Sequence, residues 1–134
     1  MTRVYVAAPF EDASKVREVH EFLRASGITP TSRWAEGIAM GAFDNAKDAA
    51  SLPDTMRKFA EQNDRDIESS SVVFVMAREG AGAEMFAEAR FALTLGKPVI
   101  WWGRPALSAW RSGVVRAKDF GDAMAKLLRA AGVA

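Results

Sequence analysis

The sequence has no cysteine and only one histidine among its 134 residues. Without cysteine the chain can form no disulfide, no thiolate metal site and no cysteine nucleophile. A single histidine also excludes a metal site built from several histidines and leaves one residue that could act as a histidine base. If the protein is an enzyme, we expect its catalytic groups to be of other types.

Clusters of like charge and long apolar runs are missing as well. The formal net charge is +1, from 18 basic and 17 acidic residues, and the basic residues are scattered along the chain. This distribution does not favour a nucleic-acid partner. No apolar signal region follows the N-terminus, and no stretch approaches the length of a membrane span. We expect a cytoplasmic protein with no nucleic-acid and no membrane partner.

The composition, 49% hydrophobic and 26% charged, is typical of a globular protein. The length predicts one domain, residues 1–134, whose core needs no disulfide or metal. Apolar β-rich runs predict buried strands at residues 3–10, 71–77 and 97–103, and weaker extended segments at 28–34 and 112–117. Helical periodicity fills the intervals, at residues 12–27, 54–67, 84–95 and 119–131.

This alternation of strands and helices predicts an α/β fold. We expect a three-layer sandwich in which helices cover both faces of a Rossmann- or flavodoxin-like parallel sheet of about five strands. Ligands of such sheets bind beyond the carboxyl ends of the strands. Three loops should meet at that edge, at residues 8–12, 33–37 and 78–82. Residues 35–53 are expected to form an irregular excursion that could cover the site.

Two glutamates, Glu84 and Glu88, lie one helical turn apart in an otherwise apolar stretch at this edge. Glu84 opens the helix, where the partial positive charge of the N-terminus stabilises a carboxylate, so a structural role suffices for it. Glu88 lies a turn further in, between Ala87 and Ala89, whose small side chains let another molecule approach closely. We therefore favour a functional role for Glu88. Because residues four apart share a helix face, both acids could reach one cleft.

The segment that begins at Glu88 resembles a known enzyme family. Its sequence, EARFALTLGKPVI, is similar to the segment of nucleoside 2-deoxyribosyltransferases and related nucleotide N-glycosidases in which a glutamate opens a helix that ends in Gly-Lys-Pro-Val. The runs VYVAAPF, TSRW and NDRDIESSSVVFV also look like parts of that family, in the same order. The family's glutamate attacks the anomeric carbon of a (deoxy)ribose, displaces the base and forms a glycosyl-enzyme intermediate. The resemblance implies no metal and no organic cofactor.

The resemblance also implies roles for particular residues. Glu88 would be the nucleophile, and the hydroxyl of Tyr5 would orient it. A carboxylate suits this role because it supplies negative charge where positive charge develops, and it needs no histidine base. A second acid should protonate the departing base. The family has an aspartate where this chain has Asn63, so either Asp64 serves after a shift of register, or Asn63 only hydrogen-bonds the base. Asp66 is a further candidate contact.

Two other departures from the family affect which glutamate aligns with the family's nucleophile. Arg90 stands where the family usually has glycine. Before the glutamate the family has a small residue, but here Glu84, Met85 and Phe86 intervene. The stretch GAGAE could therefore be the motif itself, which would make Glu84 the nucleophile. Between the two we favour Glu88.

The substrate implied by the resemblance is a small-molecule nucleoside or nucleotide. Candidate contacts for it at the same edge are Pro9, Phe10, Arg33, Trp34, Gly82 and Glu84. Phe10 and Trp34 could stack on a base, and Arg33 or Arg78 could bind a 5′-phosphate. The lack of a serine-containing phosphate loop before Glu88 favours nucleosides.

Three expectations remain. Members of the family often complete their sites across subunits, so a homodimer or larger assembly is implied. The single histidine, His20, is expected at the surface or an interface, without a catalytic role. The alternative function is a binding module that recognises a nucleoside or nucleotide on the same fold without catalysis, which Asn63 and Arg90 would favour.

Overall fold

The structure is a computed structural model that describes residues 2–36, 52–78, 83–104 and 107–133. Five strands form one sheet, in which neighbouring strands are parallel and the order is β2-β1-β3-β4-β5. The strands are β1 (Arg3–Ala7), β2 (Thr29–Pro30), β3 (Val72–Ala77), β4 (Val99–Gly103) and β5 (Val114–Ala117). The flavodoxin-like α/β fold expected from the sequence is therefore confirmed.

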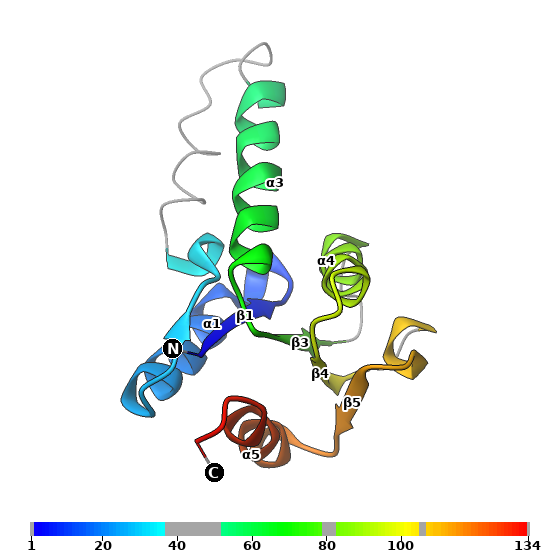
Figure 1. Cartoon of the computed structure of the whole chain (residues 1–134). Helices are drawn as coiled ribbons and strands as arrows, with labels where there is room; N and C mark the ends of the chain where they lie inside the picture. The colour runs from blue at the N-terminus through cyan, green and yellow to red at the C-terminus, as the bar shows by residue number, and fades with distance from the viewer. Residues whose placement is uncertain (1, 37–51, 79–82, 105–106, 134) are drawn as a thin grey trace.

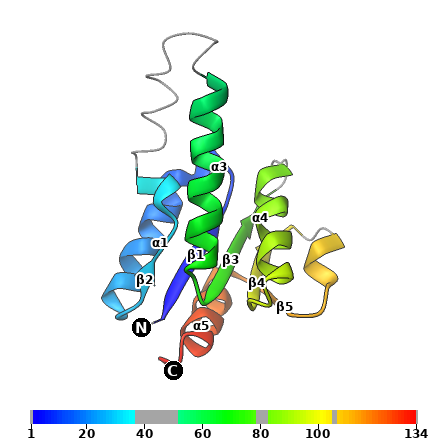
Figure 2. The same cartoon turned by 45° about the horizontal axis from the view of Figure 1, so that its top comes forward.

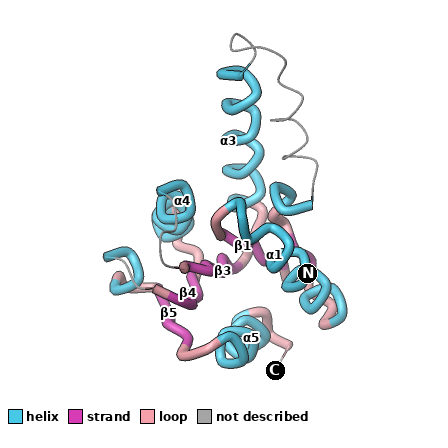
Figure 3. Tube along the Cα trace, turned by 180° about the vertical axis from the view of Figure 1, so that it is seen from behind, coloured by secondary structure: helices cyan, strands magenta, loops and turns pink. Residues whose placement is uncertain are grey.

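Helices cover both faces of this sheet (Figures 1 and 2). On one face lie α3 (Leu52–Glu68) and α4 (Ala83–Thr94), and on the other lie α1 (Ala13–Ala25) and α5 (Phe120–Ala130). Right-handed crossovers explain this placement, because the chain moves outward to β2 through α1 and in the opposite direction to β4 through α4. The view from behind in Figure 3 shows α3 projecting beyond the sheet. None of the described helices is long and apolar enough to span a membrane.

The two central strands carry most of the core. All six residues of β3 and four of the five in β1 are buried, as is typical of parallel strands covered on both faces. The apolar stripe of α1, formed by Val16, Val19 and Leu23, is at most 1% exposed. The edge strands β2 and β5 are shorter and less buried.

The extended segment expected at residues 28–34 is mostly not a strand. Only Thr29 and Pro30 pair with β1, and the amide of Thr31 makes one further bond, to the carbonyl of Val4 at 2.8 Å. The chain then turns into the 3₁₀ helix η2 (Arg33–Glu36). Proline gives no ladder donor, so a strand that contains it stays short and at the edge of the sheet.

The predicted helices lie where the periodicity put them. The helix expected from residue 54 begins at Leu52, and α5 starts after Asp119, whose carboxylate accepts a hydrogen bond from the amide of Asp122 at 2.7 Å. This N-cap satisfies one of the free amides of the first turn. Of the excursion expected at residues 35–53, the part at 37–51 lies outside the described residues. Two shorter 3₁₀ helices are η1 (Phe10–Asp12) and η3 (Leu107–Trp110).

One glycine at the carboxyl edge of the sheet cannot be replaced freely. Gly103 ends β4 with φ of 105°, and a Cβ added there would lie 1.7 Å from the carbonyl oxygen of Ala77. The amide of Arg104 donates to the same carbonyl at 2.8 Å. Only glycine combines this conformation with so close a backbone approach.

Candidate active site

A pocket of about 420 Å³ opens beyond the carboxyl end of β1, between η1, η2, α3 and α4. This is the edge at which doubly wound sheets bind their ligands, and the volume falls in the range of small-molecule pockets. Its lining residues are Ala8, Pro9, Phe10, Glu11, Trp34, Met56, Phe59, Ala60, Asn63, Ala83, Glu84, Met85 and Glu88.

Glu88 lines this pocket and contacts the core strand below it. The buried face of α4, formed by Met85, Ala89 and Ala92, packs on the sheet and brings Glu88 over β1. There the hydroxyl of Tyr5, whose side chain is fully buried, donates a hydrogen bond to Oε2 of Glu88. The contact predicted between these two residues is present, with one carboxylate oxygen held by the phenol.

Burial sets the protonation of both partners. The pKa of Glu88 rises from 4.5 to about 7, chiefly because burial disfavours the charged carboxylate. The hydrogen bond from Tyr5 opposes this rise in the pKa, while the charges of Glu84 and Asp64 add to it. The pKa of Tyr5 is raised well above its ordinary value by burial and by the neighbouring Glu88. The phenol therefore stays protonated and can donate across the whole neutral range.

Asn63 reaches the pocket from α3 with its amide unsatisfied. Its Oδ1 is buried and has no hydrogen-bond partner among the described residues. A buried carbonyl without a donor costs about 1–3 kcal/mol, which an N–H group of a ligand would recover. Asn63 thus lines the pocket, and its contact with a base stays a prediction.

The other carboxylates differ in their access to the pocket. Glu84 is exposed in the first turn of α4 and belongs to the lining. Asp64, the candidate acid, is exposed on α3 and is not among the lining residues, although its charge raises the pKa of Glu88. The described residues include no group of three His, Asp or Glu side chains that could hold a metal ion.

Two of the predicted substrate contacts instead bind each other. The guanidinium of Arg33 donates to Oδ1 of Asp66 from Nη2 at 2.7 Å and from Nε at 2.9 Å. The Asp66 carboxylate is buried, whereas the Arg33 side chain is 56% exposed. Neither residue lines the pocket. The pair connects η2 to the end of α3.

Aromatic side chains form one wall of the pocket. The indole of Trp34 is 3% exposed and donates from Nε1 to the carbonyl of Val6 at 2.9 Å. Phe10 packs edge-to-face against Trp34, with ring centroids 5.6 Å apart, and is 43% exposed. Of these two rings, Phe10 therefore presents more surface to a base. Pro9 is buried in the lining, and Gly82 lies outside the described residues.

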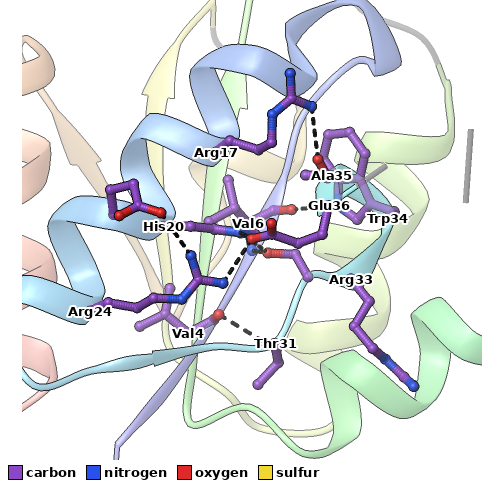
Figure 4. Close-up of polar contacts among 12 residues, drawn as sticks. Val4, Val6, Arg17, His20, Arg24, Thr31, Arg33, Trp34, Ala35 and Glu36 are labelled. Atoms are coloured by element: carbon purple, nitrogen blue, oxygen red, sulfur yellow. Dashed lines mark hydrogen bonds and ion pairs between the residues drawn. The ribbon is translucent and has the colours of Figure 1, made fainter. Parts of the chain in front are cut away.

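The expectation that His20 lies at the surface is wrong, because the residue is 1% exposed. Its Nδ1 lies 2.5 Å from a carboxylate oxygen of Glu36 (Figure 4). Its Nε2 lies 2.7 Å from Oγ of Ser32. Arg24 also binds Glu36, at 2.8 Å. Burial lowers the pKa of His20. The neutral imidazole thus bridges α1 and η2, and it holds in place the turn that carries Trp34.

The spacing of apolar residues in α1 indicates that this histidine is buried. His20 follows Val16 by four positions and Leu23 follows His20 by three, so the histidine belongs to the buried stripe. Its partners Ser32 and Glu36 carry no such signal, since they become neighbours only when η2 folds against α1.

The fold of the chain is shared with several solved enzymes, although no protein-family model and no curated protein sequence matches it. A 2-deoxyribosyltransferase from Leishmania mexicana superposes with a TM-score of 0.66 at 13% identity, covering 96% of this chain and 98% of that one. A CMP N-glycosidase, BcmB, from Clostridium botulinum gives 0.61 at 15% identity, with 94% and 98% covered. A 2-deoxyribosyltransferase from Bacillus psychrosaccharolyticus gives 0.58 at 16% identity, with 90% and 89% covered. Over nearly its full length, the chain has the fold of enzymes that cleave or transfer N-glycosidic bonds.

Proposed function

We propose that the protein cleaves or transfers the N-glycosidic bond of a (deoxy)nucleoside or nucleotide through a covalent intermediate on Glu88. One observation carries this proposal: Glu88 is a partly buried carboxylate at the wall of a ligand-sized pocket, and Tyr5 holds one of its oxygens. The other oxygen, which no described residue hydrogen-bonds, would attack the sugar. The shared fold supports the proposal, and the resemblance of residues 88–100 supports the choice of glutamate.

The reaction would take place in two displacements at the anomeric carbon. In the first, an oxygen of Glu88 bonds to C1′ while the bond from C1′ to the base nitrogen breaks and its electron pair leaves with the base. In the second, water or another base attacks C1′ and the carboxylate departs. A carboxylate stabilises the oxocarbenium-like transition state of each step. Water as acceptor gives hydrolysis, and a base gives transfer.

Tyr5 and Asn63 would assist at opposite ends of the scissile bond. The hydrogen bond from Tyr5 fixes the orientation of the Glu88 carboxylate and favours its ionised form. The unsatisfied Oδ1 of Asn63 would accept an N–H of the base. An amide cannot supply a proton, so the departing base would take its proton from Asp64 or from water.

An analogue that traps the intermediate tests this proposal. A 2′-fluoro-arabinosyl nucleoside slows both steps, because fluorine destabilises positive charge at C1′, and the covalent adduct accumulates when its hydrolysis is the slower step. We expect the wild-type protein to gain the mass of the fluorosugar on the peptide that contains Glu88, and the variant Glu88→Gln to gain nothing. An adduct on Glu84 instead would identify Glu84, one helical turn earlier, as the nucleophile. Turnover is measured in parallel, as base released from a panel of nucleosides and nucleotides with and without an acceptor base.

The second candidate function is a non-catalytic binding module. Asn63 favours it, because an amide replaces the family's acid at the position that contacts the base. This candidate predicts that a nucleoside binds in calorimetry while no substrate of the panel releases base and no adduct forms. Release of base by the wild-type protein, lost in Glu88→Gln, would contradict it.

A further inference from the structure

We propose that the pocket accepts nucleosides with a free 5′-hydroxyl and excludes their 5′-phosphates. This inference rests on the proposed function, since it names the substrate class of the same site. Three carboxylates line the pocket, those of Glu11, Glu84 and Glu88, and none of the other described lining residues is lysine, arginine or histidine. A phosphate monoester carries between one and two negative charges at neutral pH. Placed among these carboxylates, it would meet charge of its own sign.

The helix N-terminus at this edge, which ordinarily attracts a phosphate, carries an acidic side chain of its own. The amides of a helix N-terminus and the helix dipole favour an anion, and α4 begins beside the pocket. Glu84 lies in the first turn of α4 and is exposed at the pocket lining. A phosphate at the N-terminus of α4 would therefore approach the negative charge of Glu84.

The two arginines that could have compensated a phosphate do not line the pocket, and each already pairs with carboxylates, which for Arg78 include that of Glu11 in the lining. Arg33 is bound by the carboxylate of Asp66 through two nitrogens. Arg78 donates from Nε to Oδ2 of Asp12 at 3.0 Å, and its Nη2 lies 3.6 Å from the carboxylate of Glu11. Recruiting either arginine to a phosphate would break these contacts.

The protonation of Glu88 is consistent with an accumulation of negative charge. The charges of Glu84 and Asp64 both raise the pKa of Glu88. A phosphate in the pocket would raise that pKa further and reduce the fraction of ionised nucleophile. Exclusion of the phosphate thus also avoids a further loss of the ionised form of Glu88. A 5′-hydroxyl, in contrast, can donate a hydrogen bond to a carboxylate such as that of Glu84.

Matched pairs of substrate test the inference. Each common deoxynucleoside is compared with its own 5′-monophosphate, by kcat/KM for base release and by dissociation constant in calorimetry. We expect a preference for the nucleoside of about 100-fold or more at low salt, because like-charge contacts in a binding site are strongly disfavoured. The preference should narrow as ionic strength rises, since salt screens the repulsion.

Two variants that each remove one negative charge distinguish an effect of the pocket lining from an effect of net charge. Glu84→Gln removes a carboxylate from the lining and should reduce the preference, measured as the ratio of the two dissociation constants, by about tenfold. Glu18→Gln removes an exposed carboxylate from α1, outside the lining, and should leave the ratio unchanged within about twofold. Dissociation constants are used for the variants because they do not depend on which glutamate is the nucleophile.

The outcomes distinguish this inference from the function on which it rests. A monophosphate that binds and turns over as well as its nucleoside would overturn the exclusion of phosphate and leave the glycosyl chemistry standing. An equal effect of Glu84→Gln and Glu18→Gln would overturn the role of the pocket lining. If no compound released base, the catalytic proposal would fail, and the ratio of dissociation constants would still decide whether the pocket rejects phosphate.

Discussion

The ionisation of Glu88 should make the folded protein less stable as the pH rises, and replacement by glutamine should remove this effect. The folded-state pKa is about 7, against 4.5 for an unperturbed glutamate. The folded protein therefore binds this proton more tightly than the unfolded chain does. The resulting stabilisation is complete below about pH 4.5 and is lost between that value and about pH 7. Above pH 7, folding has to bury an ionised carboxylate.

The displacement of the pKa gives the size of the effect. At about 1.4 kcal/mol for each pKa unit, the shift from 4.5 to about 7 corresponds to roughly 3 kcal/mol in the free energy of unfolding. Glu88→Gln keeps the shape of the side chain and its contact with Tyr5 but cannot ionise. The variant should therefore gain about 3 kcal/mol relative to the wild type between pH 4 and pH 8.

Urea unfolding at a series of pH values measures this difference. The free energies of unfolding of wild type and Glu88→Gln are subtracted at each pH, so that groups common to both cancel. Glu18→Gln is the matched control, because this exposed carboxylate lies on α1 outside the pocket lining and should change the difference by less than about 0.5 kcal/mol. A difference between wild type and Glu88→Gln that stays flat from pH 4 to pH 8 would refute the reasoning, since Glu88 would then have an ordinary pKa.

Three further predictions concern neighbouring features. Tyr5→Phe removes the bond that lowers the pKa of Glu88, so the rising limb of the kcat/KM profile should move to higher pH; an unmoved limb would mean that the phenol does not tune the carboxylate. Gly103→Ala should lower the free energy of unfolding by about 2 kcal/mol or more. Gly27 also has a positive φ, but a Cβ added there would meet nothing within 4 Å, so Gly27→Ala should lower it by only about 1 kcal/mol. Thermal denaturation compares the two variants, and equal losses of stability would contradict the clash at Gly103. Arg33→Gln leaves a buried carboxylate without its guanidinium and should destabilise by about 1–2 kcal/mol in urea unfolding, with an unchanged preference between nucleoside and nucleotide; a changed preference would show that this arginine does bind phosphate.

The architecture could be predicted because local patterns determine it. Continuous apolar runs, as in β3, mark strands buried on both faces, and their alternation with amphipathic helices leaves a parallel sheet as the stable arrangement. The same alternation predicts the edge at which ligands bind, and the pocket lies there. The contact between Tyr5 and Glu88 was also expected, but from the family resemblance. The sequence pattern alone places one on a strand and the other on a helix, without their register.

Pairings between distant polar residues could not be predicted in this way. Arg33 and Asp66 are 33 positions apart, and each alone is a reasonable ligand for a substrate. Their mutual ion pair depends on how η2 meets the end of α3, which no periodicity encodes. For the same reason, the sequence could not predict that Ser32 and Glu36 are the partners of His20. The strand expected through residue 34 ends at Pro30, and the chain then turns into η2. Because the amides of Thr29 and Thr31 donate to the chain at β1, the position of Pro30 faces away from the ladder, where a missing N–H is tolerated at the sheet edge.

Selectivity and pH dependence should have a common cause at this site. The carboxylate of Glu84 raises the pKa of Glu88, and the same charge is the one that a 5′-phosphate would meet. Removing it should therefore change two properties together: Glu84→Gln should weaken the rejection of phosphate and shift the rising limb of the kcat/KM profile to lower pH. A purely steric barrier would survive in Glu84→Gln, because glutamine has the size of glutamate, so the limb would move without a change in selectivity. A remote charge effect would be reproduced by Glu18→Gln. Only repulsion inside the pocket predicts both changes in one variant and neither in the other.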